Sequence, residues 1–511
     1  MASEATRKNP IAVFMAFGTK GDVYPISAIA AAFASARKQY EVAFVTHSAH
    51  EDLRGHLGIK GVQYFPIFSP PTLSSVQENN NTGGSTEGSF SMQKHEITRK
   101  HRKECLLVVE SIYGETPTID GDLIIINFFA LEGWSLAELF DIRCVVAAPY
   151  VVPYSAPSSF ERQFRNELPL LYKYLQQAPI GKIGWEDVTH WMWPLFSEDW
   201  GTWRSHELQL SFWPFTDPVT GLPTWHVRPP SPILLYGFSQ EVVECPGYWP
   251  SAVRVCGFWF PPVEWQFSCS KCAEISLRKL NAENELCSMH AKLDKFLDSS
   301  AERPIFISLS SIGSMGYMRN PQAFLRVIEK VSSITKHRFI LLSAGYGPLD
   351  AAIQLFAQTP SSNTERIEST EVQTCLFDDR LFCFSGAVPY SWLFPRCCAA
   401  IHHGGSGSTA VALRAGIPQV ICPFILDQFY WAERMCWLGV APDPLDRSCL
   451  VPDEDDDTCI SKAANVIVSA INYALSTEVR SRATQIADRI STEDGVSTAL
   501  RVIEKEILCS D

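Results

Sequence analysis

Residues 401–409, Ile-His-His-Gly-Gly-Ser-Gly-Ser-Thr, decide the fold, because they join an apolar strand to a helix that is predicted to stop at Gly416. Glycines let a backbone approach a phosphate closely, and a helix start offers unpaired N–H groups with a favourable dipole. The stretch therefore predicts a phosphate site with side-chain donors from His403, Ser408 and Thr409. A tight strand-to-helix turn that binds nothing is the alternative.

A polar pair, Asp427 and Gln428, follows the next predicted strand at residues 419–422. Ligands bind at the carboxyl ends of parallel strands, so we expect the pair to lie near the glycine-rich loop. Asp427 can accept and Gln428 can donate or accept hydrogen bonds, which suits the hydroxyls of a sugar. The same pair could instead cap the following helix.

Outward from these motifs, apolar strands alternate with helix-length segments in both halves of the chain. This alternation predicts an α/β fold with two doubly wound, Rossmann-like parallel sheets. The expected strands are residues 11–17, 41–46, 122–127, 143–148, 304–309, 339–343, 381–384, 399–401 and 419–422.

The length of 511 residues predicts two lobes rather than one core. We expect a first lobe at residues 1–265, a linker and boundary helix at 266–303, and a second lobe at 304–490. A last helix at 491–511 is expected to cross back to the first lobe. Within the first lobe, the polar residues 69–92 predict a mobile loop.

Residues 150–265 form an aromatic, proline-rich region of the first lobe. Eleven of the 14 tryptophans fall between Trp134 and Trp265, which favours a large apolar pocket wall. A thick helical cap around an ordinary core is the alternative.

Charge and composition exclude several classes of partner. A net charge of −13 argues against nucleic acid or an anionic membrane surface as the main partner. The polar start and the absence of about 18 uninterrupted apolar residues predict a cytoplasmic protein, with peripheral association at a membrane surface left open. The 16 dispersed cysteines are expected to be reduced thiols.

Four motifs together resemble the nucleotide-sugar glycosyltransferase superfamily. They are HHGGSGST with LRAGIPQVICPFILDQFYWAERM after it, GTKGDVYP at residues 18–25, WPSAVRVCGFWF at 249–260 and SLSSIGSM at 308–315. The resemblance is to the UDP-glycosyltransferases of family 1, which have two facing Rossmann-like domains (the GT-B fold), and within them to the sterol 3-beta-glucosyltransferase branch.

This resemblance implies a donor site in the second lobe and an acceptor site in the first, with inversion at the anomeric carbon. Asp427 and Gln428 would hold the sugar, the backbone of Val388 would pair with the uracil edge, and Ser311 would lie in a second phosphate-facing loop. The residues expected to contact the diphosphate are His403, Gly405, Gly407, Ser408 and Thr409.

Asp22 is the predicted catalytic base, since it stands where the sterol-like branch has aspartate and many plant relatives have histidine. The alternative is that Asp22 only caps the following helix. Where the plant enzymes pair their base with an aspartate, this chain has Asn127, so Asp22 is expected to work alone. The branch usually has His-Val-Ala-Glu at residues 135–138 and His-Asp-Trp at 390–392, and this chain departs from both. Candidate acceptor-binding residues are Asn127, Trp134, Tyr150, Trp191 and Trp200.

Together these features predict an inverting transferase that moves glucose from UDP-glucose to a hydroxyl of a sterol, steroid, triterpenoid or similar lipophilic acceptor. A catalytically silent lipid-binding or scaffold relative is the alternative. No cofactor is expected, because the UDP-sugar is a co-substrate. No metal is expected either. Cys269 and Cys272 have the spacing of one cysteine pair of a zinc site, but no second pair follows at a suitable distance. The acidic residues 453–457 are interpreted as a solvated loop. A dinucleotide-binding oxidoreductase is disfavoured, because the glycines at residues 18–21 have the wrong spacing.

Overall fold

The structure is a computed structural model in two compact units, Met1–Pro261 with Glu493–Asp511, and Pro262–Thr492. It describes the following ranges, with only the backbone at residues 87–95 and 314: 7–70, 87–114, 118–150, 203–210, 232–243, 245, 252–267, 272, 290–309, 312–358, 373–425 and 427–505.

The first unit is built on a seven-stranded parallel sheet with strand order β3-β2-β1-β4-β5-β6-β7. Its central strands are runs of Ile, Val, Phe and Ala that are buried throughout, as a sheet covered on both faces requires. The strand order reverses beside β1, which pairs with β2 on one side and β4 on the other. The strands are β1 (Ile11–Met15), β2 (Glu41–His47), β3 (Val62–Ile67), β4 (Leu123–Ile126), β5 (Arg143–Ala148), β6 (Ile233–Tyr236) and β7 (Val253–Val255).

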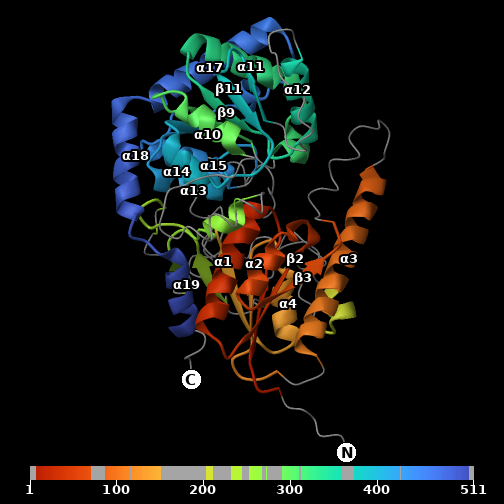
Figure 1. Cartoon of the computed structure of the whole chain (residues 1–511). Coiled ribbons are helices and arrows are strands. Elements are labelled where there is room, and N and C mark those ends of the chain that lie inside the picture. Colours follow the sequence, from red (N-terminus) through yellow and green to blue (C-terminus); the bar gives the residue numbers. More distant parts are fainter. Residues whose placement is uncertain are drawn as a thin grey trace, which may run out of the picture. The chain divides into compact units, whose positions relative to one another are not determined.

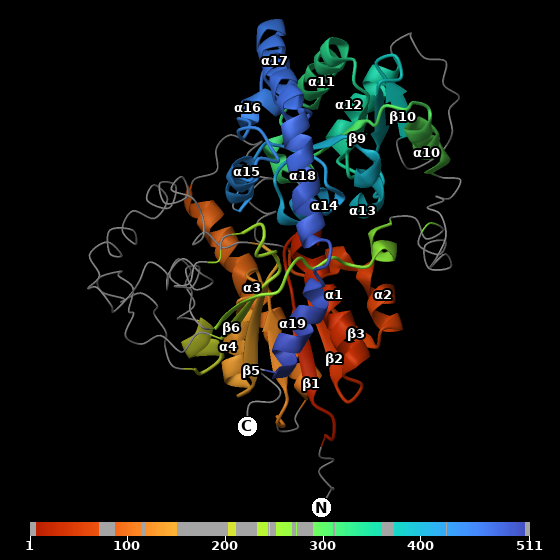
Figure 2. The same ribbon diagram turned by 90° about the vertical axis from the view of Figure 1, so that its left-hand side faces the viewer.

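The helices of the first unit are α1 (Lys20–Ala36), α2 (Leu53–Ile59), α3 (Glu87–Tyr113), α4 (Glu132–Leu139) and α19 (Gly495–Ile503), with a short 3-10 turn η1 (Ser48–His50). Figures 1 and 2 show α19 beside α1. Two ion or hydrogen-bond pairs hold this last segment to the unit: Arg37 Nε donates to Glu504 Oε1 at 2.9 Å, and Ser239 Oγ donates to Glu493 Oε1 at 2.6 Å.

Helix α1 begins earlier than its apolar pattern indicated. The pattern placed the start at residue 26, whereas the helix begins at Lys20 and includes Pro25. Thr19 is the N-cap residue, and the carboxylate of Asp22 accepts a bond from its backbone N–H. The segment that carries Asp22 therefore forms the first turn of the helix.

The second unit is built on a six-stranded sheet with order β10-β11-β9-β8-β12-β13, in which only the β10–β11 pair is antiparallel. Its strand order reverses beside β8, which lies between β9 and β12. The strands are β8 (Ile305–Ser308), β9 (Phe339–Leu342), β10 (Gln373–Leu376), β11 (Leu381–Phe384), β12 (Ala399–His402) and β13 (Gln419–Ile421).

The helices of the second unit cover both faces of this sheet, with α11 and α17 side by side (Figure 1). They are α10 (Ala291–Asp298), α11 (Pro321–Thr335), α12 (Gly347–Ala357), α13 (Tyr390–Leu393), α14 (Ser406–Ala415), α15 (Gln428–Trp437), α16 (Arg447–Leu450), α17 (Asp457–Ala474) and α18 (Thr477–Ile490). Within the described ranges, none of the helices combines the length and apolar character that crossing a bilayer requires.

Four strands of the described ranges were not predicted: β3, β6, β7 and β10. β3 contains Gln63 and Pro66, which interrupt its apolar run, and β6 and β7 lie inside the aromatic, proline-rich region. β10 is an edge strand with half-exposed residues, so its sequence carries no continuous apolar signal.

Candidate active site

Asp22 lies just beyond the carboxyl end of β1, at the point where the strand order of the first sheet reverses. One carboxylate oxygen, Oδ2, accepts from the backbone N–H of Thr19 at 2.7 Å and from the Thr19 hydroxyl at 2.8 Å. Gly18 has φ +109°, and a Cβ on it would lie 2.6 Å from Oδ2. Only glycine therefore allows this loop to close against the carboxylate.

Asn127 fixes the same loop from the end of β4. It is fully buried, and its Nδ2 donates to the carbonyl oxygens of Phe17 at 2.8 Å and Asp22 at 3.4 Å. Its Oδ1 accepts from the backbone N–H groups of Phe17 and Phe129, each at 3.2 Å. The side chain thus bonds the main chain of the loop and makes no bond to the Asp22 carboxylate.

Burial raises the pKa of Asp22 from 3.8 to about 6, and the two bonds from Thr19 oppose that shift. The residue as a whole stays partly exposed, so the carboxyl group is desolvated without being sealed off. A carboxylate with a pKa near neutrality is a better proton acceptor than an ordinary aspartate.

The glycine-rich loop of the second unit joins β12 to α14 at that sheet's own reversal point. Gly405 is the N-cap of α14, and the helix ends at Gly416 in the left-handed region, as the sequence predicts. Thr409 N, which donates to Gly405 O at 3.0 Å, makes the first bond of the helix. The preceding N–H groups of Ser406, Gly407 and Ser408 have no partner within the helix and are available to an anion.

Two buried side-chain atoms beside this helix start have no hydrogen-bond partner among the described residues: His403 Nδ1 and Thr409 Oγ1. His403 is 7% exposed and Thr409 is fully buried. Burial, with the neighbouring His402 as the smaller cause, lowers the pKa of His403 to about 3, so its ring is neutral. Unsatisfied buried polar atoms are costly, and a ligand that bonded them would remove that cost.

The adjacent His402 forms hydrogen bonds within the protein through both of its ring nitrogens. Its Nε2 lies 2.8 Å from Gln419 Oε1, and its Nδ1 accepts from Gly404 N at 3.0 Å. Both ring nitrogens are therefore used inside the protein. His402 shapes the loop, and only His403 of the pair keeps an unpartnered ring nitrogen within the described part of the chain.

The turn that carries Asp427 and Gln428 touches the glycine-rich loop. Gly404 has φ +86°, and a Cβ on it would lie 3.1 Å from the carbonyl oxygen of Gln428. Gln428 Oε1 accepts from the backbone N–H groups of Phe424 at 2.9 Å and Ile425 at 3.2 Å, which leaves its amide nitrogen as the donor for other partners. The structure thus brings together the two motifs that the sequence predicted to be neighbours.

Trp431 is a residue of this site that the sequence reasoning missed. It is fully buried one helical turn after Asp427, and its indole N–H donates to Asp427 Oδ2 at 3.0 Å. The spacing of four residues at a helix start was a usable signal. Asp427 is the N-cap residue of α15 by position, but its side chain makes no capping bond.

The remaining predicted residues are placed as follows. The Val388 side chain is buried in the core of the second unit. Trp134 lies on α4 and Tyr150 follows β5, both largely buried, with Phe128 5.8 Å and Phe129 6.0 Å from the Tyr150 ring. Ser311, Trp191 and Trp200 lie outside the described residues.

Arg204 is a second residue that the sequence reasoning missed. It is fully buried and donates to Ser135 Oγ at 2.9 Å and to Glu138 Oε2 at 2.7 Å. Ser135 and Glu138 begin and end the four-residue segment where this chain departs from the sterol-like pattern. No local sequence signal marks the pairing, because Arg204 is 66 residues from Glu138.

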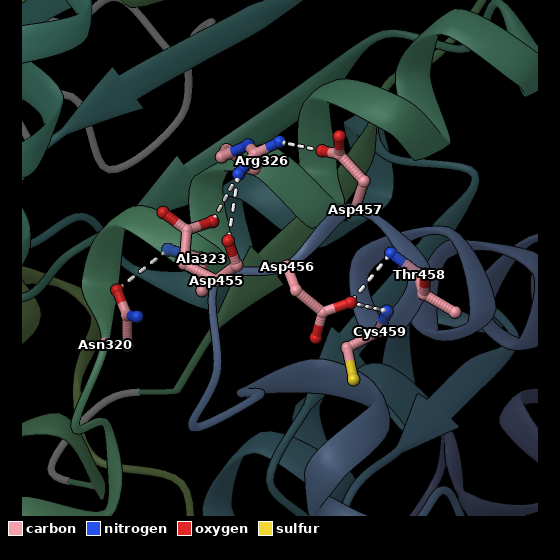
Figure 3. Close-up of polar contacts among 8 residues, drawn as sticks. All are labelled: Asn320, Ala323, Arg326, Asp455, Asp456, Asp457, Thr458 and Cys459. Atoms are coloured by element: carbon pink, nitrogen blue, oxygen red, sulfur yellow. Dashed lines mark hydrogen bonds and ion pairs between the residues drawn. The ribbon is translucent and has the colours of Figure 1, made fainter.

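The acidic residues 453–457 lead into α17, with Asp456 as its N-cap and Asp457 as its first residue (Figure 3). Asp456 accepts from the backbone N–H groups of Thr458 at 2.9 Å and Cys459 at 3.0 Å, and Asp455 and Asp457 pair with Arg326. Glu454, Asp456 and Cys459 are close together but all exposed. Helix capping and ion pairing account for this cluster.

Comparisons with known proteins agree with this architecture. Residues 382–493 match the family described as erythromycin biosynthesis protein CIII-like, C-terminal domain. A sterol 3-beta-glucosyltransferase of Arabidopsis thaliana is 23% identical over 500 residues, which are 96% of this chain and 67% of that protein. A sterol 3-beta-glucosyltransferase of Emericella nidulans is 25% identical over 501 residues, which are 96% of this chain and 30% of that protein. The calicheamicin glycosyltransferase CalG4 superposes with a TM-score of 0.58 at 15% identity, covering 99% of this chain and 100% of that one.

The fold is therefore that of the GT-B glycosyltransferases, and the predicted fold class is confirmed. The predicted resemblance to the UDP-glycosyltransferases is confirmed as well: the chain is similar over nearly its whole length to sterol 3-beta-glucosyltransferases. The chain spans about two thirds of the plant relative and less than a third of the fungal one.

Proposed function

We propose that the chain is an inverting glycosyltransferase that moves glucose from UDP-glucose to a hydroxyl of a sterol or a similar lipophilic alcohol. The observation that carries this proposal is the pair of unpartnered buried atoms, His403 Nδ1 and Thr409 Oγ1, beside the start of α14. A diphosphate supplies the acceptor oxygens that these atoms and the first N–H groups of the helix lack.

In the proposed reaction, the acceptor oxygen forms a bond to the anomeric carbon while the bond from that carbon to the diphosphate oxygen breaks. Asp22 takes the hydroxyl proton as the new bond forms, and the UDP leaves with the electron pair. The helix start and His403 stabilise the charge that develops on the leaving diphosphate, which is electrostatic catalysis. Ser408 and Gly407, which are partly or fully exposed at the same helix start, leave the approach to those N–H groups open.

The sugar would be held by Asp427 and Gln428, whose turn contacts the phosphate loop. Trp431 donates to Oδ2 of Asp427 and thereby restricts the orientation of that carboxylate. The main chain at Val388 would form hydrogen bonds with the uracil, because the Val388 side chain is buried in the core. The sterol class of acceptor is supported by the names of the two relatives and by the buried aromatic residues Trp134 and Tyr150.

One experiment tests the proposal. The protein is incubated with UDP-glucose, UDP-xylose, UDP-galactose or UDP-glucuronic acid and a panel of sterols, steroids, triterpenoids and phenolics, and products are identified by mass spectrometry. A glucoside of a sterol-like alcohol is the expected product. Binding of sterols with no transfer from any donor would favour the catalytically silent relative, and a preference for small polar acceptors would contradict the acceptor class.

A further inference from the structure

The carboxylate of Asp22 has two oxygens in different surroundings. Oδ2 accepts both hydrogen bonds of Thr19, from the backbone N–H at 2.7 Å and from the hydroxyl at 2.8 Å. Oδ1 has no hydrogen-bond partner anywhere in the described part of the chain. Thr19 is thus bonded to one side of the carboxylate only.

Oδ2 is also closed to an incoming hydroxyl. A carboxylate oxygen has two lone pairs, and the two bonds from Thr19 occupy both. The backbone of Gly18 lies against the same oxygen so closely that a Cβ there would be 2.6 Å away. Because Asp22 remains partly exposed, Oδ1 is the side of the carboxylate that an acceptor can reach.

We propose that Thr19 is a positioning residue for catalysis: by holding Oδ2, its hydroxyl makes Oδ1 the oxygen that takes the acceptor proton. This inference rests on the proposed function, in which Asp22 is the base. Thr19 touches neither the acceptor nor the donor in this scheme, and acts through Asp22.

The direction of the effect follows from the two opposing influences on Asp22. Burial favours the protonated acid, whereas donation from Thr19 favours the carboxylate. Removing the Thr19 hydroxyl should therefore raise the pKa of Asp22 further, because one of the two bonds that oppose the effect of burial is lost. Asp22 would then need a higher pH to become ionised.

Other titratable groups near this loop are committed elsewhere. Asp52, which follows η1, is bonded to two residues of α1. Lys20 Nζ pairs with its carboxylate at 3.1 Å, and the Tyr24 hydroxyl donates to the same carboxylate at 2.6 Å. His50 of η1 places Nε2 3.0 Å from the carbonyl oxygen of Gly18, and burial lowers its pKa.

Two more histidines, His47 of β2 and His101 of α3, pack on Phe17 with ring centroids 4.8 Å away. Burial lowers the pKa of each to about 4, so both are neutral in the working range. Within the described residues, burial and the two hydrogen bonds from Thr19 account for the pKa shift of Asp22. Loss of the Thr19 hydroxyl should therefore change the pKa of Asp22.

The test compares the pH dependence of kcat/KM in wild type, Thr19→Val and Thr19→Ser, with UDP-glucose and the sterol identified as acceptor. Thr19→Val keeps the shape and the backbone N–H but loses the hydroxyl, and Thr19→Ser keeps the hydroxyl. We expect the acid limb of Thr19→Val to move up by about one pH unit, so that it loses about tenfold at pH 6 relative to pH 8 where wild type loses about twofold. Thr19→Ser should follow the wild-type profile.

The controls separate this role from a structural one. Ser35→Ala removes a hydroxyl from the same helix, where Ser35 Oγ donates to Ala31 O at 2.8 Å, and should leave the profile unchanged. Thr19→Ala is a second variant without the hydroxyl, should Thr19→Val fail to fold, and it should reproduce the shift. UDP affinity, measured by calorimetry, should be the same in all variants.

The outcomes distinguish the role of Thr19 from the proposed function itself. An unshifted acid limb in Thr19→Val or Thr19→Ala, or a shifted one in Thr19→Ser, overturns the role of Thr19 even when wild type is active and Asp22→Asn is not. Absence of sugar transfer by wild type, or normal turnover in Asp22→Asn, would instead overturn the proposed function.

Discussion

The indole nitrogen of Trp431 lies 3.0 Å from Oδ2 of Asp427, one helical turn away, and donates its hydrogen to it. Trp431 is fully buried, whereas Asp427 is only half-buried. The bond therefore ties a partly exposed carboxylate to the rigid interior of the second unit. A carboxylate held in this way loses little entropy when it binds a hydroxyl.

Trp431→Phe should keep the ring in the core and remove only the donor. We expect kcat/KM for the sugar donor to fall about tenfold, the order of a lost hydrogen bond to a charged group, with UDP affinity unchanged. Steady-state kinetics and UDP calorimetry measure the two quantities. Trp437→Phe is the matched control, because Trp437 lies on the same helix and is 63% exposed. An equal loss in both variants would show that the helix, and not the bond, is responsible.

Asp427→Ala should lower turnover more than UDP affinity and should change the preference among UDP-glucose, UDP-xylose and UDP-galactose. The reason is that Asp427 lies beside the glycine-rich loop without being part of the helix start that is proposed to bind the diphosphate. Competition assays with mixed donors measure the preference. A collapse of UDP affinity with unchanged sugar preference would assign Asp427 to the diphosphate instead.

His403→Ala should weaken donor use by about 1–3 kcal/mol, since it removes a donor to an anionic phosphate. Burial lowers the pKa of His403 to about 3, so the ring is neutral above pH 5, and UDP affinity should not vary with titration of this residue. Calorimetry with UDP from pH 5 to pH 8 checks both points. His337→Ala, just before the amino end of β9, is the control and should bind UDP as wild type does.

Asp22→Asn should bind the UDP-sugar normally and lose about 10²-fold or more in turnover, as removal of a general base does. In wild type the base must be ionised, so activity should be lost as pH falls through about 6. Near-normal turnover in Asp22→Asn would contradict this role.

The raised pKa of Asp22 also makes the stability of the folded protein depend on pH. Because the folded protein holds the proton of Asp22 more tightly than the unfolded chain, this group stabilises the fold below pH 4 and loses that contribution as pH rises through about 6. Melting of wild type and Asp22→Asn from pH 4.5 to pH 7.5 should therefore show the difference in stability shifting in favour of the variant as pH rises. A difference that is constant with pH would mean that the pKa of Asp22 is not raised.

Chelation should leave transfer intact, because the proposed leaving-group contacts are N–H and O–H donors. EDTA at millimolar excess over the protein, followed by product quantification, checks this. A complete loss of turnover that added Mg²⁺ or Mn²⁺ restores would require a metal in the donor site.

The sequence predicted the glycine-rich helix start and its neighbour at Asp427 because both depend on local rules: a strand end, a glycine turn and a helix cap. It also predicted most central strands, which are buried on both faces and read as apolar runs. It could not predict that Arg204 bonds Ser135, or that Asn127 bonds the main chain of the Asp22 loop, since these contacts join segments 69 and 105 residues apart. Such pairs are fixed by topology, which local patterns do not encode.

The assignment of α19 to the first unit has a consequence for synthesis of the chain. The sheet of that unit is complete once residue 255 has emerged, but the helix that packs on α1 follows the whole of the second unit. A nascent chain therefore carries a nearly finished first unit, with one face of α1 uncovered, while more than 200 further residues are translated and folded. Folding of the first unit can be completed only after residues 495–503 leave the ribosome, so the unit that begins folding first is expected to finish last.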